Sequence, residues 1–230
     1  MSLTMPVPEP EILAQRAALI ADLQRIVRPG NVIHLERELV PYECDALTMY
    51  RQPPLVVVLP ETVEEVSAIL KLAAERNVKV VPRGAGTSLS GGSLPLADGI
   101  LLGMAKFNRI LEVDWENRCA RVQPGVSNLA ITKAVEHRGF YYAPDPSSQI
   151  ACSIGGNVAE NAGGVHCLKY GLTTNNLLGV EMVLMGGEVV RLGGKHLDAE
   201  GYDLLGVVTG SEGLLGVVTE VTVRILQKPQ

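Results

Sequence analysis

The order of apolar and polar positions predicts a strand, a helix and a second strand between residues 55 and 81. Residues 55–59 (LVVVL) form a continuous apolar run typical of a buried strand, and Pro60 ends it. Thr62 and Glu65 have capping-box spacing, and the apolar positions after Thr62 share one helical face: Val63, Val66, Ile69, Leu70 and Ala73. We expect this helix to stop near Asn77. Residues 78–81 should then pair in parallel with the first strand, because a helical crossover favours that pairing.

The pattern after residue 110 is typical of antiparallel strands. Residues 110–114 and 119–123 flank a short polar turn and predict a hairpin. Ser127 can cap a helix that reaches His137 and stops at Gly139. Further strands are expected at residues 180–185, 188–192 and 216–226, with a turn at Gly186 and Gly187.

These elements predict an α+β fold with two lobes. The smaller lobe, about residues 51–112, contains the βαβ unit, and the larger, about residues 113–230, has an antiparallel sheet with helices. A helical segment, residues 1–50, precedes them, with its helix expected at residues 10–26.

Composition narrows the functional classes. The 20 basic and 25 acidic residues nearly balance, and no basic stripe favours nucleic acid. No apolar run approaches the roughly 20 residues of a membrane helix, and the start MSLTMPVPEP has no signal-peptide pattern, so we expect a cytoplasmic protein. Neither the four cysteines nor the four histidines have metal-site spacing. Glycine is enriched, with 24 of 230 residues against a usual share of about 7%.

The sharpest glycine cluster is residues 82–92 (PRGAGTSLSGG), directly after the second predicted strand. Successive glycines allow backbone N–H groups to converge on an anion, and Thr87, Ser88 and Ser90 add hydroxyl donors. A diphosphate suits this chemistry. A dinucleotide fingerprint of the Rossmann type would instead follow the first strand and open a helix, which disfavours an NAD-binding protein. An ordinary Gly/Ser turn is the alternative.

A second cluster runs from residue 144 to residue 164 and includes PDPSS and SIGGNVAENAGG. Ser153 can cap a short helix whose first turn holds Gly155 and Gly156, leaving bare N–H groups for an anion. Without side chains, these two glycines would let the backbone approach a ligand. A glycine-rich helix packed on a neighbour explains the cluster equally well. A third cluster, residues 210–219 (GSEGLLGVVT), is a glycine turn that feeds a strand.

Together, in this order, the three clusters resemble the FAD-binding domain of the vanillyl-alcohol oxidase and p-cresol methylhydroxylase superfamily. Within it they are most similar to the D component of glycolate oxidase and to the FAD-linked D-lactate and D-2-hydroxyglutarate dehydrogenases. The resemblance covers about residues 45–230.

The resemblance implies a role for each cluster. The first would wrap the FAD diphosphate, with Arg83, Gly84, Ala85, Gly86, Thr87, Ser88 and Gly91. In the second, Asp145, Ser147 and Ser148 would lie along the cofactor, and Gly155, Gly156 and Asn157 would complete the diphosphate clamp. Asn161 and Gly163 would approach the flavin side. The third would line the adenosine and ribityl region, with Glu212, Gly213, Gly216 and Val217. Ala85 stands where many relatives have glycine. Thr87 stands where some relatives carry the histidine that attaches FAD, so binding is expected to be non-covalent.

The resemblance also implies an enzyme class, a flavin-dependent 2-hydroxy-acid dehydrogenase or oxidase acting on glycolate or D-lactate. Relatives continue into a substrate domain with metal ligands, whereas this chain stops at Gln230. We therefore expect that domain to be absent, the catalytic residues to lie elsewhere and these residues to be inactive alone. The alternative is a stand-alone flavin-binding or electron-transfer subunit, with a second flavoprotein subunit and an iron–sulfur subunit as partners.

Overall fold

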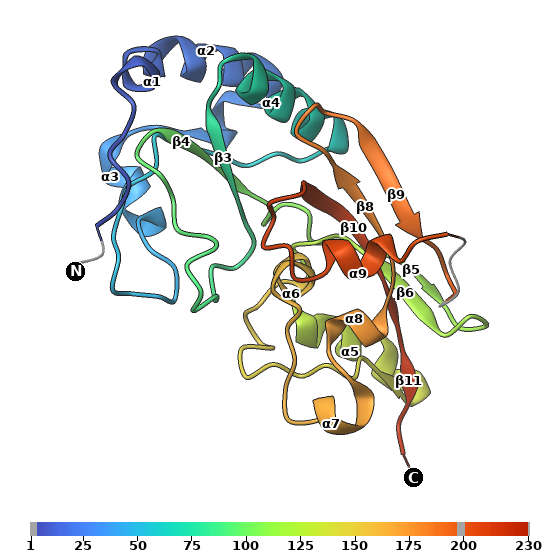
Figure 1. Cartoon of the computed structure of the whole chain (residues 1–230). Coiled ribbons are helices and arrows are strands. Elements are labelled where there is room, and N and C mark those ends of the chain that lie inside the picture. Colours follow the sequence, from blue (N-terminus) through green and yellow to red (C-terminus); the bar gives the residue numbers. More distant parts are fainter. Residues whose placement is uncertain (1–3, 197–200, 230) are drawn as a thin grey trace. The chain divides into compact units, whose positions relative to one another are not determined.

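The computed structural model describes residues 4–196 and 201–229, which fall into two compact units (Figure 1). Unit 1 comprises Met1–Lys106 with Leu184–Glu188, and unit 2 comprises Phe107–Val183 with Val189–Gln230. The outermost residues of the expected segments, 1–3 and 230, and residues 197–200 lie outside the described part. Both units mix helices and sheet, which confirms the α+β class.

Unit 1 contains a four-stranded sheet in the order β1-β2-β4-β3. Its elements are α1 (Pro10–Ala14), α2 (Arg16–Ile26), η1 (Pro29–Asn31), β1 (Val32–Ile33), α3 (Glu36–Leu39), η2 (Val40–Tyr42), β2 (Val56–Val58), α4 (Val63–Glu75), β3 (Lys79–Arg83) and β4 (Gly99–Gly103). The N-terminal helix is confirmed, with a break at Gln15 that divides it into α1 and α2. The capping box is also confirmed: Thr62 accepts the backbone N–H of Glu65, whose side chain accepts the backbone N–H of Thr62.

The predicted direct pairing of the first two strands of unit 1 is wrong. β4 lies between β2 and β3 and is parallel to both. Every residue of β4 is buried, and its sequence GILLG has only three apolar side chains between two glycines, a shorter and less β-branched run than LVVVL at residues 55–59. β2 and β3 therefore share one direction, as the crossover rule requires, but a third strand separates them.

Unit 2 contains a five-stranded antiparallel sheet in the order β5-β6-β10-β8-β9 and a small β7-β11 pair. Its elements are β5 (Ile110–Asp114), β6 (Cys119–Val122), α5 (Asn128–Val135), η3 (Glu136–Arg138), β7 (Phe140–Tyr141), α6 (Ile154–Glu160), α7 (Cys167–Tyr170), α8 (Thr173–Asn176), β8 (Leu177–Val183), β9 (Val189–Gly193), α9 (Leu204–Val208), β10 (Val217–Arg224) and β11 (Leu226–Gln227). The predicted hairpin, the Ser127 cap and the stop at left-handed Gly139 are confirmed. The long last strand divides at Ile225, where the chain passes from the large sheet to the small one.

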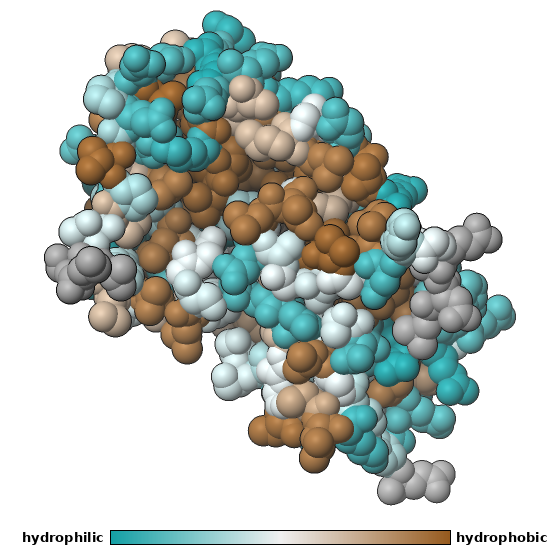
Figure 2. All heavy atoms as spheres, viewed as in Figure 1, coloured by the Kyte–Doolittle hydropathy of each residue, from teal (hydrophilic) through white to brown (hydrophobic). Residues whose placement is uncertain are grey.

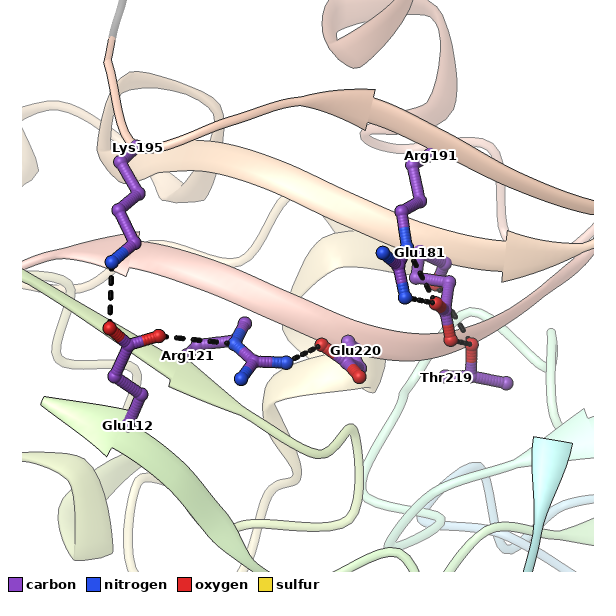
Figure 3. A network of polar contacts seen from close by, with 7 residues as sticks. All are labelled: Glu112, Arg121, Glu181, Arg191, Lys195, Thr219 and Glu220. Atoms are coloured by element: carbon purple, nitrogen blue, oxygen red, sulfur yellow. Dashed lines mark hydrogen bonds and ion pairs between the residues drawn. The ribbon is translucent and has the colours of Figure 1, made fainter.

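Charged side chains are linked in a network on the five-stranded sheet of unit 2 (Figure 3). Arg191 Nε and Nη2 both donate to Oε2 of buried Glu181, at 2.8 and 2.6 Å. Thr219 lies at a register shift of β10, and its hydroxyl donates to Glu181 Oε1 at 2.9 Å. Arg121 links Glu112 to Glu220 in the same network. The buried carboxylate is thus fully partnered, as burial of a charge requires.

No helix among residues 4–196 and 201–229 is long and apolar enough to cross a membrane. All four cysteines are free thiols.

Candidate functional site

The first glycine cluster forms a loop after β3 in unit 1, and we call residues 83–91 the glycine loop. No helix follows β3 before β4, as predicted. Gly86 and Gly91 have positive φ, at 67° and 82°, a conformation that residues with a Cβ rarely adopt. The Ser88 hydroxyl accepts the backbone N–H of Ser90 at 3.1 Å, so part of its hydrogen-bonding capacity already holds the turn.

The Arg83 side chain is buried and bonded to main-chain oxygens of the protein. Nη1 donates to the Tyr42 carbonyl at 2.9 Å and Nη2 donates to the Cys44 carbonyl. Burial lowers the pKa of the guanidinium, and the charge of Asp45 opposes that shift. Arginine nevertheless stays protonated in proteins. Arg83 therefore carries a buried positive charge at the start of the glycine loop.

Helix α6 in unit 2 begins as predicted, but the expectation of bare N–H groups in its first turn is wrong. Ser153 Oγ accepts the N–H of Gly156 at 3.4 Å, and the Pro124 carbonyl accepts the N–H of Gly155 at 2.8 Å. The N–H of Ile154 is also bonded, to the Val126 carbonyl at 2.8 Å. The sequence gives one indication that these N–H groups are bonded: the proline-glycine pair at residues 124 and 125 predicts a turn, which can place a main-chain carbonyl near the start of α6.

The two glycines of α6 have different surroundings. A Cβ at Gly155 would lie 2.6 Å from Pro124 Cβ, closer than real Cβ contacts allow, whereas a Cβ at Gly156 would meet only Ser153 Oγ, at 3.3 Å. Gly155 is therefore required by packing inside unit 2. Gly156 is the position in this turn where a missing side chain leaves the backbone open.

Two asparagines of the second cluster lie in α6 and at its C-cap. Asn157 is buried, and its Nδ2 has no hydrogen-bond partner among the described residues. An orphaned buried donor costs free energy unless another molecule accepts from it. Asn161 ends the helix in the left-handed conformation, at φ 51°, and its Oδ1 accepts the N–H of Thr174 at 3.0 Å. Asn157 is thus the side chain of α6 that is best suited to a ligand.

The third cluster packs against α6, so unit 2 brings the second and third clusters together. The N–H of Gly210 donates to the Val158 carbonyl at 2.8 Å, and the N–H of Glu212 donates to the Ala159 carbonyl at 2.9 Å. Glu212 and Gly213 both have positive φ, at 54° and 78°. These bonds close the turn onto the last turn of the helix.

The end of the third cluster enters the sheet. A Cβ at Gly216 would lie 2.6 Å from both Met182 Cε and the Val183 carbonyl oxygen. Val217 is buried and pairs with Val183 in the sheet. Both residues thus serve the packing of unit 2, Gly216 through its missing side chain and Val217 through its buried one.

The carboxylate of Asp145 is bonded to His166, a pairing that the sequence did not predict. Asp145 Oδ2 lies 2.6 Å from His166 Nδ1, and Oδ1 accepts the His166 N–H at 3.3 Å. A Cβ at Gly164 would collide with the Asp145 carbonyl, and one at Gly163 would collide with Leu172. No motif spacing links residues that are 21 positions apart, so only the fold reveals the pair.

His166 of the Asp145–His166 pair lies directly before α7 (Cys167–Tyr170), in a segment that buries little of its own apolar surface. Val165 and Leu168 are exposed, and apolar side chains reach the surface around α7 at the lower end of the view (Figure 2). A four-residue helix is marginal without packing. Of the other predicted residues nearby, Ser147 is exposed, and the Ser148 carbonyl accepts the N–H groups of Ala151 and Cys152.

No group of three His, Cys, Asp or Glu side chains in the described part of the chain is placed to hold a metal ion.

Comparisons with known proteins agree on one family. The model of a family described as FAD binding domain matches residues 54–193, which is more than half of the chain. Glycolate oxidase subunit GlcD of Escherichia coli K12 is 58% identical over 214 residues, covering 93% of this chain and 43% of its own. D-lactate dehydrogenase of Archaeoglobus fulgidus is 42% identical over 191 residues, covering 79% and 43% respectively. The chain thus spans under half the length of these curated relatives.

A solved structure of alkyldihydroxyacetonephosphate synthase has the same fold. It matches with a TM-score of 0.81 at 23% identity and covers 100% of this chain and 43% of its own.

Proposed function

The chain belongs to the FAD binding domain family, and on that premise we propose that it binds FAD through its glycine-rich segments. In unit 1 the glycine loop would hold the diphosphate, with backbone N–H groups and the hydroxyls of Thr87 and Ser88 as donors. In unit 2 the contacts would come from Gly156, Asn157 and the turn at Glu212 and Gly213. The observation that carries this proposal is the family match over residues 54–193, which contains the glycine loop and all of α6.

The residues present fit a cofactor of this kind. Buried Asn157 Nδ2 has no acceptor among the described residues, and polar acceptors are plentiful on a dinucleotide. The positive charge of Arg83, buried at the base of the glycine loop, favours an anion nearby. When bound, FAD would supply the two-electron chemistry of its flavin ring, and the protein would supply binding and orientation.

We expect the binding to be non-covalent. Covalent attachment in the glycine loop would require a nucleophilic side chain, and the position at which some relatives carry a histidine is Thr87, whose hydroxyl is a poor nucleophile without a base.

We further propose that the whole protein is a cytoplasmic 2-hydroxy-acid dehydrogenase or oxidase, acting on glycolate or D-lactate. The names of the two relatives support this substrate class. The Asp145 carboxylate is bonded to His166 and the Glu212 N–H to the Ala159 carbonyl, both within unit 2, and we assign neither residue a catalytic role.

A second candidate is a flavin-binding or electron-transfer subunit that works with partner chains. The E. coli relative is named a subunit of glycolate oxidase, which supports this alternative. A second flavoprotein subunit and an iron–sulfur subunit are the partners that we would seek. Co-purification of the natively expressed protein, followed by mass measurement of the complex, would separate the two candidates.

The FAD assignment is tested by comparing FAD with FMN. A ligand that binds only the folded state raises stability by about 2.7 kcal/mol at a concentration of 100 Kd. FAD should therefore raise the melting temperature of the purified protein clearly, whereas FMN, which has a single phosphate, should raise it much less. Equal shifts with the two flavins would refute the diphosphate assignment.

A further inference from the structure

The segment before the first FAD-domain strand is tied to the glycine loop by hydrogen bonds on both sides. We call residues 42–47 the 42–47 segment. From the loop, Arg83 donates to the carbonyls of Tyr42 and Cys44. In the other direction, the N–H of Ala46 donates to the Gly86 carbonyl at 2.9 Å. Two short stretches that are about 40 positions apart thus lie side by side within unit 1.

Asp45 fixes the far end of the same contact. Its Oδ1 accepts the N–H of Leu47 at 2.8 Å, and its Oδ2 accepts the Ser93 hydroxyl at 3.2 Å. A Cβ at Gly91 would lie 3.3 Å from Leu47 Cδ2, so the loop also packs closely on the segment. Asp45 is buried, and a buried carboxylate requires such partners.

Arg83 is bonded in a way that only arginine allows. Its two Nη atoms reach two carbonyls that are two residues apart, which needs the planar fork of a guanidinium. Its Nε has no hydrogen-bond partner among the described residues, and a Cβ at Gly86 would lie 3.1 Å from that atom. A buried donor without a partner costs stability, so the link between the two stretches depends on the bonds of the two Nη atoms.

We propose that Arg83 is a positioning residue that joins the 42–47 segment to the glycine loop, and that this segment is therefore part of the FAD-binding site. The guanidinium holds residues 84–86 in place from inside the protein and does not need to touch the cofactor. Asp45 holds the other end of the segment against Ser93. This inference rests on the proposed function, because the loop that is positioned is the one assigned to the diphosphate.

The test compares Arg83→Lys and Asp45→Asn with a control that weakens unit 1 elsewhere. Lysine keeps the charge but cannot span both carbonyls, and asparagine keeps the size of Asp45 but loses its charge. Thr62→Ala removes the side-chain cap of α4 and so weakens unit 1 at a site with no role in the loop. FAD affinity is measured by flavin fluorescence at a temperature where each protein is folded, and hydrogen exchange of residues 42–47 and 84–91 is followed without FAD.

We expect Arg83→Lys to lower FAD affinity by about tenfold or more, which corresponds to 1.4 kcal/mol, and Asp45→Asn to lower it by a smaller factor. Both variants should speed exchange in residues 42–47 and 84–91 but not in α4. Thr62→Ala should speed exchange in α4 and bind FAD like the parent. If Arg83→Lys does not fold, the inference is tested by the FAD affinity and hydrogen exchange of the milder Asp45→Asn variant.

Parent-like FAD affinity in both Arg83→Lys and Asp45→Asn would overturn this inference but not the proposed function. Equal losses of affinity in Arg83→Lys and Thr62→Ala would also overturn it, because the effect would then follow general stability. If the parent itself fails to bind FAD, the proposed function falls, and this inference falls with it.

Discussion

Replacing Gly155 and Gly156 one at a time should separate packing from cofactor binding in α6. In Gly155→Ala the new methyl would lie 2.6 Å from Pro124 Cβ and 3.2 Å from the Pro124 carbonyl oxygen. That oxygen also accepts the N–H of Gly155, so the helix cannot move away without losing a hydrogen bond. Overpacking of this kind costs about 1–3 kcal/mol, and alanine in a helix regains roughly 0.5–1 kcal/mol over glycine. We expect a net loss of about 1–2 kcal/mol.

Gly156→Ala should behave in the opposite way. Its methyl would meet only the Ser153 hydroxyl at 3.3 Å, which can shift by a few tenths of an ångström. The gain in helix propensity and the strain on the Ser153 cap nearly cancel, so stability should stay within about 1 kcal/mol of the parent. If the backbone at Gly156 approaches the cofactor, however, the methyl should lower FAD affinity by about tenfold.

The assay for stability uses Trp115, the only tryptophan of the chain. It lies in unit 2 with its ring centroid 5.6 Å from that of His137, so its fluorescence reports unfolding of the unit that contains α6. Urea titrations of the FAD-free proteins give stability, and flavin fluorescence titrations give affinity. A Gly155→Ala protein as stable as the parent would show that the Pro124 contact does not constrain the helix. A Gly156→Ala protein that binds FAD like the parent would leave α6 as a packing helix only.

Three further predictions concern the cofactor, the acid response and activity. Acid precipitation of the FAD-loaded protein should leave all flavin in the supernatant because Thr87 cannot form a histidyl bond, and a yellow pellet would contradict this. Asp98 is a buried carboxylate: burial alone would raise its pKa, but hydrogen bonds from Lys79 and from the Glu9 N–H lower it below the usual value. Its contribution is therefore present above the unfolded pKa of about 3.9 and lost as pH falls through the folded pKa. Asp98→Asn should cost about 1–2 kcal/mol at pH 7 in urea titrations, and a difference that persists at pH 2 would refute this. Finally, residues 1–230 alone should not reduce a dye with glycolate or D-lactate. Catalysis needs the substrate carbon about 3–3.5 Å from its acceptor and a base within reach. Turnover equal to that of a C-terminally extended protein would refute this prediction.

Local signals in the sequence predicted most of the helices and strands. They could not predict which residues far apart in the sequence are bonded to each other. The capping box at Thr62 and the cap at Ser127 are local, since both partners lie within three positions. β4 was missed because its apolar run is only three residues long, lies between two glycines and contains one β-branched residue, whereas the predicted strand at residues 55–59 has five apolar residues. The Asp145–His166 bond and the hydrogen bonds from Arg83 to the 42–47 segment join residues that are 21 to 41 positions apart, which only the folded chain brings together.

The glycines illustrate why a motif can be specific for a family and still say little about which residues touch a ligand. The excess of glycine suggested backbone brought close to something, and at Gly155 and Gly216 that neighbour is the protein itself: Pro124 in one case and Met182 with Val183 in the other. Such glycines are required by the fold of unit 2 whether or not a cofactor binds. Gly156 is different, because a Cβ there would meet only one movable hydroxyl. A residue that contacts FAD should therefore be recognised by a substitution that leaves the fold stable but lowers FAD affinity. Within α6 the two residues to test are Gly156 and Asn157, whose Nδ2 has no partner among the described residues.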